Sequence, residues 1–105
     1  MTDESSFRHL ADLDRVVHEP ARLAIMAVLY TVEGADFIYL LHSTGLTKGN
    51  LSSHLMRLEE AGYVQISKGF RGKVPQTTCA LTVPGRAAFQ AYHQRLREAV
   101  DSLPT

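Results

Sequence analysis

A segment near the middle of the chain, residues 47–60, combines small polar and basic side chains at helical spacing. Leu51, Leu55 and Leu58 repeat at i, i+4 and i+7, which predicts one buried helical face. The opposite face centres on small or hydrogen-bonding residues and is flanked by cations: Lys48, Gly49, Asn50, Ser52, Ser53, Met56, Arg57 and Glu60. Glycine, serine and asparagine are poor helix formers, so an ordinary solvated face would hold more glutamate and lysine.

A helix with such small polar side chains on its outer face is suited to the major groove of DNA, where these side chains would hydrogen-bond with base edges. Thr47, Lys48 and the free amides of the helix start are suited to binding phosphate. An ordinary solvated helix face is the competing interpretation.

The charge of the chain is balanced overall but unevenly distributed. Its 105 residues hold 11 basic and 11 acidic groups, 45% hydrophobic residues and four prolines, which is typical of one globular domain and not of a disordered chain. Residues 1–46 carry three arginines against seven acids, whereas residues 47–75 carry five basic groups against two acids. A positive segment of this kind is what a phosphate-facing surface requires, although chance fluctuation is the alternative explanation.

Other functional chemistry has weaker support. The single cysteine, Cys79, has no CxxC or CxC companion and falls in an alternating apolar strand, which predicts an inert buried thiol. The histidines fall on different predicted elements, without HExxH or GxSxG motifs nearby: His9, His18, His42, His54 and His93. We therefore expect no enzyme, no metal site and no cofactor. No apolar run approaches the roughly 20 residues of a membrane helix, and no signal peptide pattern is present, so the expected location is the cytoplasm.

Two helices are predicted before the central segment. The first covers about residues 5–18 and has apolar residues at steps of three and four. The second begins at Pro20 and is apolar on all sides, so it must be covered either within one subunit or partly by another.

A short third helix, residues 37–45, is predicted to be capped by Asp36 and closed by Gly45. With the helix of residues 47–62, which Thr47 caps, it has helix-turn-helix proportions over about residues 36–62.

Residues 63–82 alternate apolar and polar side chains on both sides of a glycine, which predicts a β-hairpin with Gly72 in its turn. Arg71 and Lys73 would lie at the tip and Lys68 on the approach to it. Cations on a hairpin beside a groove-reading helix would touch the DNA backbone or the minor groove. A solubilising loop is the competing interpretation.

The last helix is predicted over about residues 83–103, with Thr82 as its cap. Its apolar residues step by three or four, as in paired helices. Both terminal helices would leave apolar surface uncovered in a monomer of this size, which favours a homodimer. The predicted dimerisation residues are Phe7, Leu10, Val17, Phe89, Tyr92, Leu96, Val100 and Leu103.

The segments LTKGNLSSHLMRLEEAGYV (residues 46–64) and FRGKVPQTTCALTVPGRAAF (residues 70–89), preceded by HEPARLAIMAVL, resemble small winged helix-turn-helix transcriptional regulators of the MarR-like and ArsR-like groups. The resemblance implies an α+β, mainly α, fold: a winged helix-turn-helix with a two-stranded hairpin wing, flanked by N- and C-terminal dimerisation helices. The resemblance spans about residues 13–92, and the length of the chain is that of one domain, so residues 1–105 are predicted to be a single winged-helix domain.

The resemblance further implies a homodimer that binds double-stranded operator DNA sequence-specifically, with helix 47–62 in the major groove and residues 68–75 as the wing. The implied DNA-binding residues are Thr47, Lys48, Gly49, Asn50, Ser52, Ser53, His54, Arg57, Lys68, Arg71 and Lys73. His54 flanks the core and is interpreted as structural or phosphate-contacting rather than base-reading. A small-molecule effector of unknown identity is compatible with such a regulator. A protein-interaction adaptor without DNA binding is the alternative function.

Overall fold

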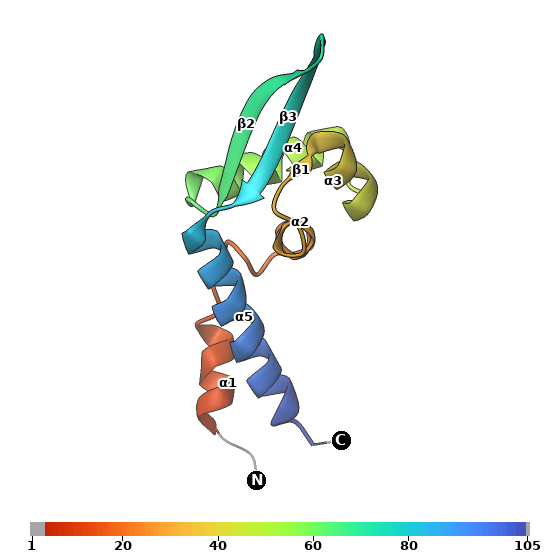
Figure 1. Ribbon diagram of the computed structural model, residues 1–105. Coiled ribbons are helices and arrows are strands. Elements are labelled where there is room, and N and C mark those ends of the chain that lie inside the picture. The colour runs from red at the N-terminus through yellow and green to blue at the C-terminus, as the bar shows by residue number, and fades with distance from the viewer. Residues whose placement is uncertain (1–3, 105) are drawn as a thin grey trace.

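The computed structural model describes residues 4–104 as five helices and three strands in an elongated arrangement of 60 × 24 × 21 Å. The hairpin of β2 and β3 projects at one end, and α1 and α5 lie side by side at the other (Figure 1). In chain order the elements are α1 (Glu4–Ala11), α2 (Pro20–Tyr30), β1 (Ala35–Asp36), α3 (Phe37–Thr44), α4 (Lys48–Glu60), β2 (Val64–Arg71), β3 (Val74–Leu81) and α5 (Val83–Asp101).

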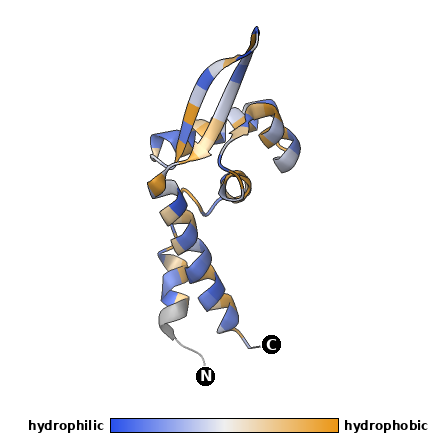
Figure 2. Cartoon of the chain, viewed as in Figure 1, coloured by the Kyte–Doolittle hydropathy of each residue, from blue (hydrophilic) through white to orange (hydrophobic). Residues whose placement is uncertain are grey.

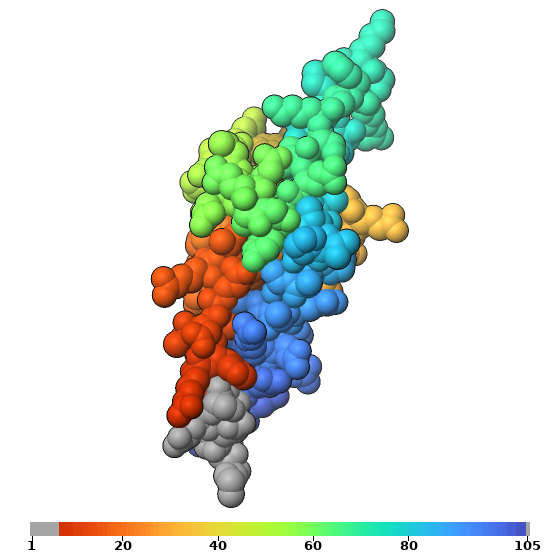
Figure 3. Space-filling view, turned by 90° about the vertical axis from the view of Figure 1, so that its left-hand side faces the viewer, coloured from red at the N-terminus to blue at the C-terminus, as the bar shows by residue number. Residues whose placement is uncertain are grey.

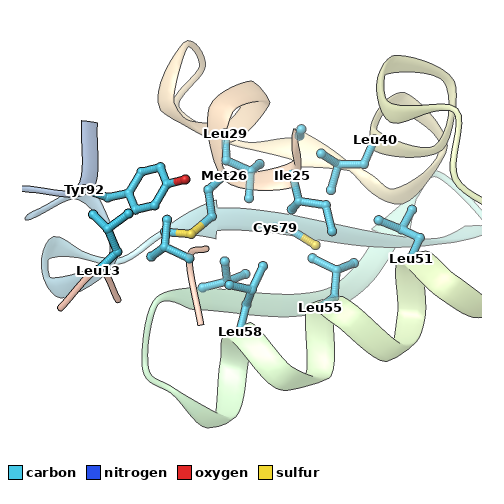
Figure 4. Close-up of a cluster of buried hydrophobic side chains, with 13 residues drawn as sticks. Leu13, Ile25, Met26, Leu29, Leu40, Leu51, Leu55, Leu58, Cys79 and Tyr92 are labelled. Carbon is cyan, nitrogen blue, oxygen red and sulfur yellow. The ribbon is translucent and has the colours of Figure 1, made fainter. Parts of the chain in front are cut away.

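The core lies where α2, α3, α4 and the sheet meet (Figure 4). The predicted buried face of α4 is confirmed, because Leu51, Leu55 and Leu58 are all buried. They pack with apolar side chains of the other elements: Val17, Ile25, Met26, Leu29, Leu40, Val64 and Cys79. Apolar residues dominate α2, whereas α5 carries mainly hydrophilic residues (Figure 2). Each fully buried aliphatic side chain stabilises the fold by about 1.5–3 kcal/mol, so α2 and α4 hold the domain together.

The predicted helix caps are present. Asp36 Oδ1 accepts the N–H of Tyr39 at 2.7 Å at the start of α3. Thr82 Oγ1 accepts the N–H of Gly85 at 3.0 Å at the start of α5. Pro20 occupies the first turn of α2, where its missing N–H costs no hydrogen bond. These local signals set the helix starts as the sequence predicts.

The first helix is shorter than predicted. It ends at Ala11, and the residues up to α2 form turns instead of continuing to residue 18. Asp14 Oδ1 accepts the N–H groups of Val16 and Val17 at 2.8 and 3.2 Å. An aspartate that bonds nearby backbone amides in this way competes with helical hydrogen bonds. Val17 therefore turns into the core instead of lying along an outer helix face.

The fold class is confirmed as mainly helical with a winged hairpin, but the sheet has a third strand that the sequence does not predict. β1 pairs antiparallel with β3, with Ala35 opposite Cys79 and Asp36 opposite Thr78, so the strand order is β1-β3-β2. Two residues are too few to show a strand periodicity. The pairing places the start of α3 beside the root of the hairpin.

Candidate nucleic-acid interface

The turn before α4 determines where this helix lies. Gly45 has a left-handed backbone with φ 70° and donates its N–H to Leu41 O at 3.1 Å, which ends α3. Thr47 Oγ1 then accepts the N–H of Asn50 at 3.2 Å and begins α4. Leu46, between these two caps, packs against the core. α3 and α4 thus form a helix-turn-helix pair whose second helix lies at the surface.

The outward face of α4 is exposed along its length. Figure 3 shows α4, in yellow-green, on the outer surface next to the root of the hairpin. The first acidic residue of the helix is Glu59, so the earlier turns present no negative charge. Met56 is also exposed on this face and can contact a thymine methyl group, although it is not among the predicted site residues. The predicted groove-facing residues are all exposed: Lys48, Gly49, Asn50, Ser52, Ser53 and Arg57.

His54 is half-buried and faces the start of α2. Its Nδ1 lies 3.7 Å from Glu19 Oε2 and 3.3 Å from Arg22 Nη1. Arg22 Nε in turn donates to Val16 O at 2.6 Å. Burial would raise the pKa of Glu19, but the N–H groups of Arg22 and Ala21 and the charges of His54 and Arg22 outweigh it and lower this pKa. These contacts of His54 hold the middle of α4 against the start of α2. They favour a structural role for His54 over base reading.

β2 and β3 form a projecting hairpin, called the wing below (Figure 1). Arg71 pairs with Val74, so the turn is the two residues Gly72 and Lys73. Gly72 has φ 64°, and among the described residues only glycines have positive φ, which is the pattern of a type II′ turn. The predicted turn position of Gly72 is confirmed. The three predicted cations of the wing, Lys68, Arg71 and Lys73, are all exposed. Two apolar residues to which the sequence assigns no role, Phe70 and Val74, are exposed as well.

The root of the wing is joined to α5 by close backbone contacts. Thr82 donates its N–H to Tyr63 O at 3.0 Å and its Oγ1–H to Gly62 O at 2.6 Å. Gly85 is buried against Tyr63, and a Cβ at this position would lie 2.0 Å from Tyr63 O. Tyr63 donates its hydroxyl to Asp14 Oδ2, and this hydrogen bond, together with burial, raises the pKa of Tyr63 to about 12. These contacts fix the direction of the wing relative to α5.

A helix-turn-helix pair with an exposed second helix, followed by a cationic hairpin, agrees with the comparison with known families. A family model described as a winged helix DNA-binding domain matches residues 21–100, which extend from the start of α2 almost to the end of α5. The chain belongs to this family. The winged-helix protein is therefore a DNA-binding transcriptional regulator and not an enzyme, which confirms the resemblance found in the sequence.

Individual relatives of the winged-helix protein come from archaea and bacteria. The uncharacterized protein MJ0432 of Methanocaldococcus jannaschii is 39% identical over 79 residues, covering 74% of this chain and 85% of the relative. A transcriptional regulator homologue from Pyrococcus horikoshii OT3 has 27% identity and a TM-score of 0.87, covering 96% of this chain and 99% of that one. A protein from Enterococcus faecalis V583 assigned to the MarR family shares the fold, with 20% identity and a TM-score of 0.74 over 96% of this chain and 89% of that one.

The winged-helix subunit itself covers part of the predicted dimer surface. Val17 and Tyr92 are predicted from the sequence to contact a partner, but they are only 0% and 4% exposed within one subunit. Tyr92 also lies with its hydroxyl 2.8 Å from His18 Nδ1. The prediction is wrong for these two residues, because the turns after α1 bring Val17 into the core and α5 packs Tyr92 onto it. Three of the other predicted residues are half-buried, namely Phe7, Phe89 and Leu96. The remaining three are exposed, namely Leu10, Val100 and Leu103.

Cys79 lies in the centre of the core, between α2 and α4 (Figure 4). Its thiol is buried as predicted, and burial, with a smaller contribution from the charge of Glu59, raises its pKa to about 11. Within residues 7–104, no cluster of three or more His, Cys, Asp or Glu side chains is arranged to hold a metal ion. Over the same residues, no helix has both the length and the apolar character needed to cross a membrane.

Proposed function

We propose that the protein binds double-stranded operator DNA sequence-specifically as a homodimer, with α4 of each subunit in the major groove and each wing on the backbone or in the adjacent minor groove. One observation carries this proposal. Ser52 and Met56 on the outward face of α4 line the same open cleft as Lys68 of the wing. The polar helix face and the cationic hairpin thus open toward one side, where a single duplex can meet both.

The residues of α4 divide by position along the helix. Thr47 and Lys48, at the helix start, are placed to hold a phosphate together with the free backbone amides. Gly49 leaves room for close approach of the sugar-phosphate backbone, since nothing lies within 4 Å of a Cβ built there. Base edges would be read by the exposed side chains of the middle turns, with Arg57 on a base or a phosphate: Asn50, Ser52, Ser53 and Arg57. His54 would position the helix or touch a phosphate from its flank.

The proposed dimer is built from the terminal helices. α1 and α5 lie together at the end opposite the wing, where His9 Nδ1 is 3.9 Å from Glu98 Oε2 (Figure 1). Leu10, Val100 and Leu103 expose apolar side chains there, which supports an isologous helical interface. Two α4 helices related by such a twofold axis would enter successive major grooves about 34 Å apart, on a roughly palindromic site.

The remaining parts of the proposal follow from this arrangement. Residues 1–105 act as a single winged-helix domain, with the helix-turn-helix at about 36–62, the wing at about 63–82 and the C-terminal helix at about 83–103. The location proposed for this regulator is the cytoplasm, as the sequence predicts. A small-molecule effector that alters DNA affinity is a further expectation, with its identity open.

Selection of duplexes from a random library by the purified protein tests the proposal. The expected result is an enriched palindrome with half-sites about 10 base pairs apart, bound more weakly as salt rises. Arg57→Ala should lower affinity by about ten-fold, since a bidentate contact is worth about 1–3 kcal/mol. The pair Arg71→Ala and Lys73→Ala should lower the salt dependence by up to about two phosphate contacts. Arg97→Ala removes an exposed cation from α5, which lies 3.8 Å from Asp101, and should change neither property.

The dimer is tested separately by sedimentation. Val100→Asp should give monomers that bind the selected duplex more weakly, because a charge would be buried in the interface. Val83→Asp places the same substitution on an exposed residue at the other end of α5 and should leave the dimer intact.

If the purified protein showed no salt-sensitive association with any duplex, the adaptor function would be favoured instead. A monomeric wild-type protein would refute the dimer.

A further inference from the structure

The outer half of the wing exposes an aromatic ring. Phe70 is 75% exposed and precedes Arg71 at the tip, while Val74 on the opposite strand is 66% exposed. Residues 61–75 contain no acidic group and three cations. Keeping a large apolar side chain in water forgoes about 1.5–3 kcal/mol that burial would provide. A ring in this position is therefore explained better by a contact made in a complex than by the stability of the free subunit.

The turn geometry determines the direction of this ring. In a two-residue type II′ hairpin, the residues that flank the turn, here Arg71 and Val74, form a hydrogen-bonded pair. The next pair, Phe70 and Pro75, is then non-hydrogen-bonded, so the missing N–H of Pro75 costs no ladder bond. Side chains of such pairs lie on the same face of the hairpin, so Pro75 is the cross-strand neighbour of Phe70.

The ring lies on the side of the wing that faces the proposed DNA. Side chains alternate along a strand, so Phe70 shares a face with Lys68, Ile66 and the buried Val64. This face packs on α4 at its inner end, and Ile66 and Lys68 line the cleft beside Met56. Phe70 continues the same face outward, beyond the end of the cleft.

The length of the wing matches the distance from a major groove to the neighbouring minor groove. Phe70 lies four residues beyond Ile66, or roughly 14 Å at 3.4 Å per residue. Half a turn of B-DNA, the distance from a major groove centre to the next minor groove, is about 17 Å. In Figure 3 the outer part of the wing extends beyond the other described residues, which leaves it accessible on the side shown.

We propose that Phe70 is an apolar wedge that enters the minor groove beside the α4 site and partly unstacks one base step, while Arg71 and Lys73 hold the flanking phosphates. This inference rests on the proposed DNA binding and adds deformation of the DNA to it. Apolar side chains inserted in the minor groove kink the duplex, and pyrimidine–purine steps such as TA and CA unstack at the lowest cost. The wing therefore selects flexible steps outside the bases that α4 reads. The lack of acidic residues in the segment 61–75 suits a polyanion better than a protein partner.

The test uses the palindromic duplex enriched by the wild-type protein, with 2-aminopurine in place of one adenine at a time outside each half-site. Wild-type protein should raise the fluorescence of one such position, because unstacking removes its quenching. Phe70→Ala should abolish this rise and weaken binding about ten-fold, with the salt dependence unchanged because no phosphate contact is lost. Phe70→Leu retains an apolar wedge and should keep most of the affinity and the fluorescence.

Matched controls separate the wedge from general effects. Val83→Ala truncates another exposed apolar side chain, away from the wing, and should change neither affinity nor fluorescence. Lys73→Ala should lower the salt slope by about one and keep the fluorescence rise. Equal affinity of Phe70→Ala and wild type, or no unstacked position in the wild-type complex, would overturn the wedge while DNA binding itself stands. If the wild-type protein enriches no duplex, the proposed function and the wedge both fail.

Discussion

Gly85 and Gly49 are both helical glycines, and the structure predicts opposite effects for the same substitution. Gly85 lies in the first turn of α5, where a Cβ would be 2.0 Å from the carbonyl oxygen of Tyr63 and 2.7 Å from its carbonyl carbon. Both contacts are to backbone, so no side-chain rotation relieves them. Gly49 lies in the first turn of α4, and a Cβ there meets nothing within 4 Å.

The cost of Gly85→Ala can be estimated from the contacts that must move. The Cβ must retreat from 2.0 Å to at least 3.0 Å from Tyr63 O. Overpacking of a buried site costs about 1–3 kcal/mol. The movement also strains the hydrogen bonds of Thr82 to Tyr63 O and Gly62 O, each worth about 1 kcal/mol. We therefore expect a loss of about 3–5 kcal/mol from a total stability of about 5–15 kcal/mol. Gly49→Ala should instead stabilise the protein by about 0.4–1 kcal/mol.

Urea denaturation followed by circular dichroism measures both variants, at one fixed protein concentration because dimerisation would otherwise shift the apparent stability. Gly85→Ala should also lower the melting temperature by about 12 °C or more. If Gly85→Ala were as stable as wild type, α5 would not pack against the turn at Tyr63 as described. If Gly49→Ala were strongly destabilising, the exposed position of that helix start would be wrong. Weaker DNA binding by a well-folded Gly49→Ala protein would agree with close approach of DNA at that position.

Three further predictions concern Tyr63, Cys79 and Thr47. The pKa of Tyr63 is about 12 in the folded state against 10.0 otherwise, so its hydrogen bond to Asp14 stabilises the fold fully below pH 10, and this contribution is lost as the pH rises through 12. The urea midpoint of Tyr63→Phe should accordingly fall less steeply than that of wild type across this range, and parallel curves would contradict the assignment. Cys79, with a pKa of about 11, should react with Ellman's reagent at pH 8 about a hundred-fold more slowly in the native protein than in guanidinium, whereas equal rates would show that the thiol is accessible. Thr47→Ala should cost about 1 kcal/mol in urea denaturation by removing the cap of α4, and Thr47→Ser should recover most of it.

Features that depend on neighbours in the chain could be predicted from the sequence alone. A capping side chain acts on an amide three residues away, so Asp36, Thr47 and Thr82 mark the helix starts without knowledge of the fold. The leucine spacing of α4 determines which face is buried and, by subtraction, which face is free for DNA. The positive φ of Gly72 is likewise a local requirement of the turn. The helix-turn-helix and the wing, with their exposed polar and basic residues, were therefore predictable.

Features that depend on contacts between distant segments were decided by the tertiary structure. Helical spacing extends past Ala11, but the side chain of Asp14 bonds the backbone of the next turn and also accepts the hydroxyl of Tyr63, which sends Val17 into the core. The two-residue strand β1 exists only because β3 lies beside it. Gly85 lies within a segment that carries the family resemblance, but the sequence does not show why a glycine is needed there. The cause is the carbonyl oxygen of Tyr63, 22 positions earlier in the chain, which leaves no room for a Cβ. Local periodicity and capping carry no information about such pairs, because each partner has an acceptable local structure without the other.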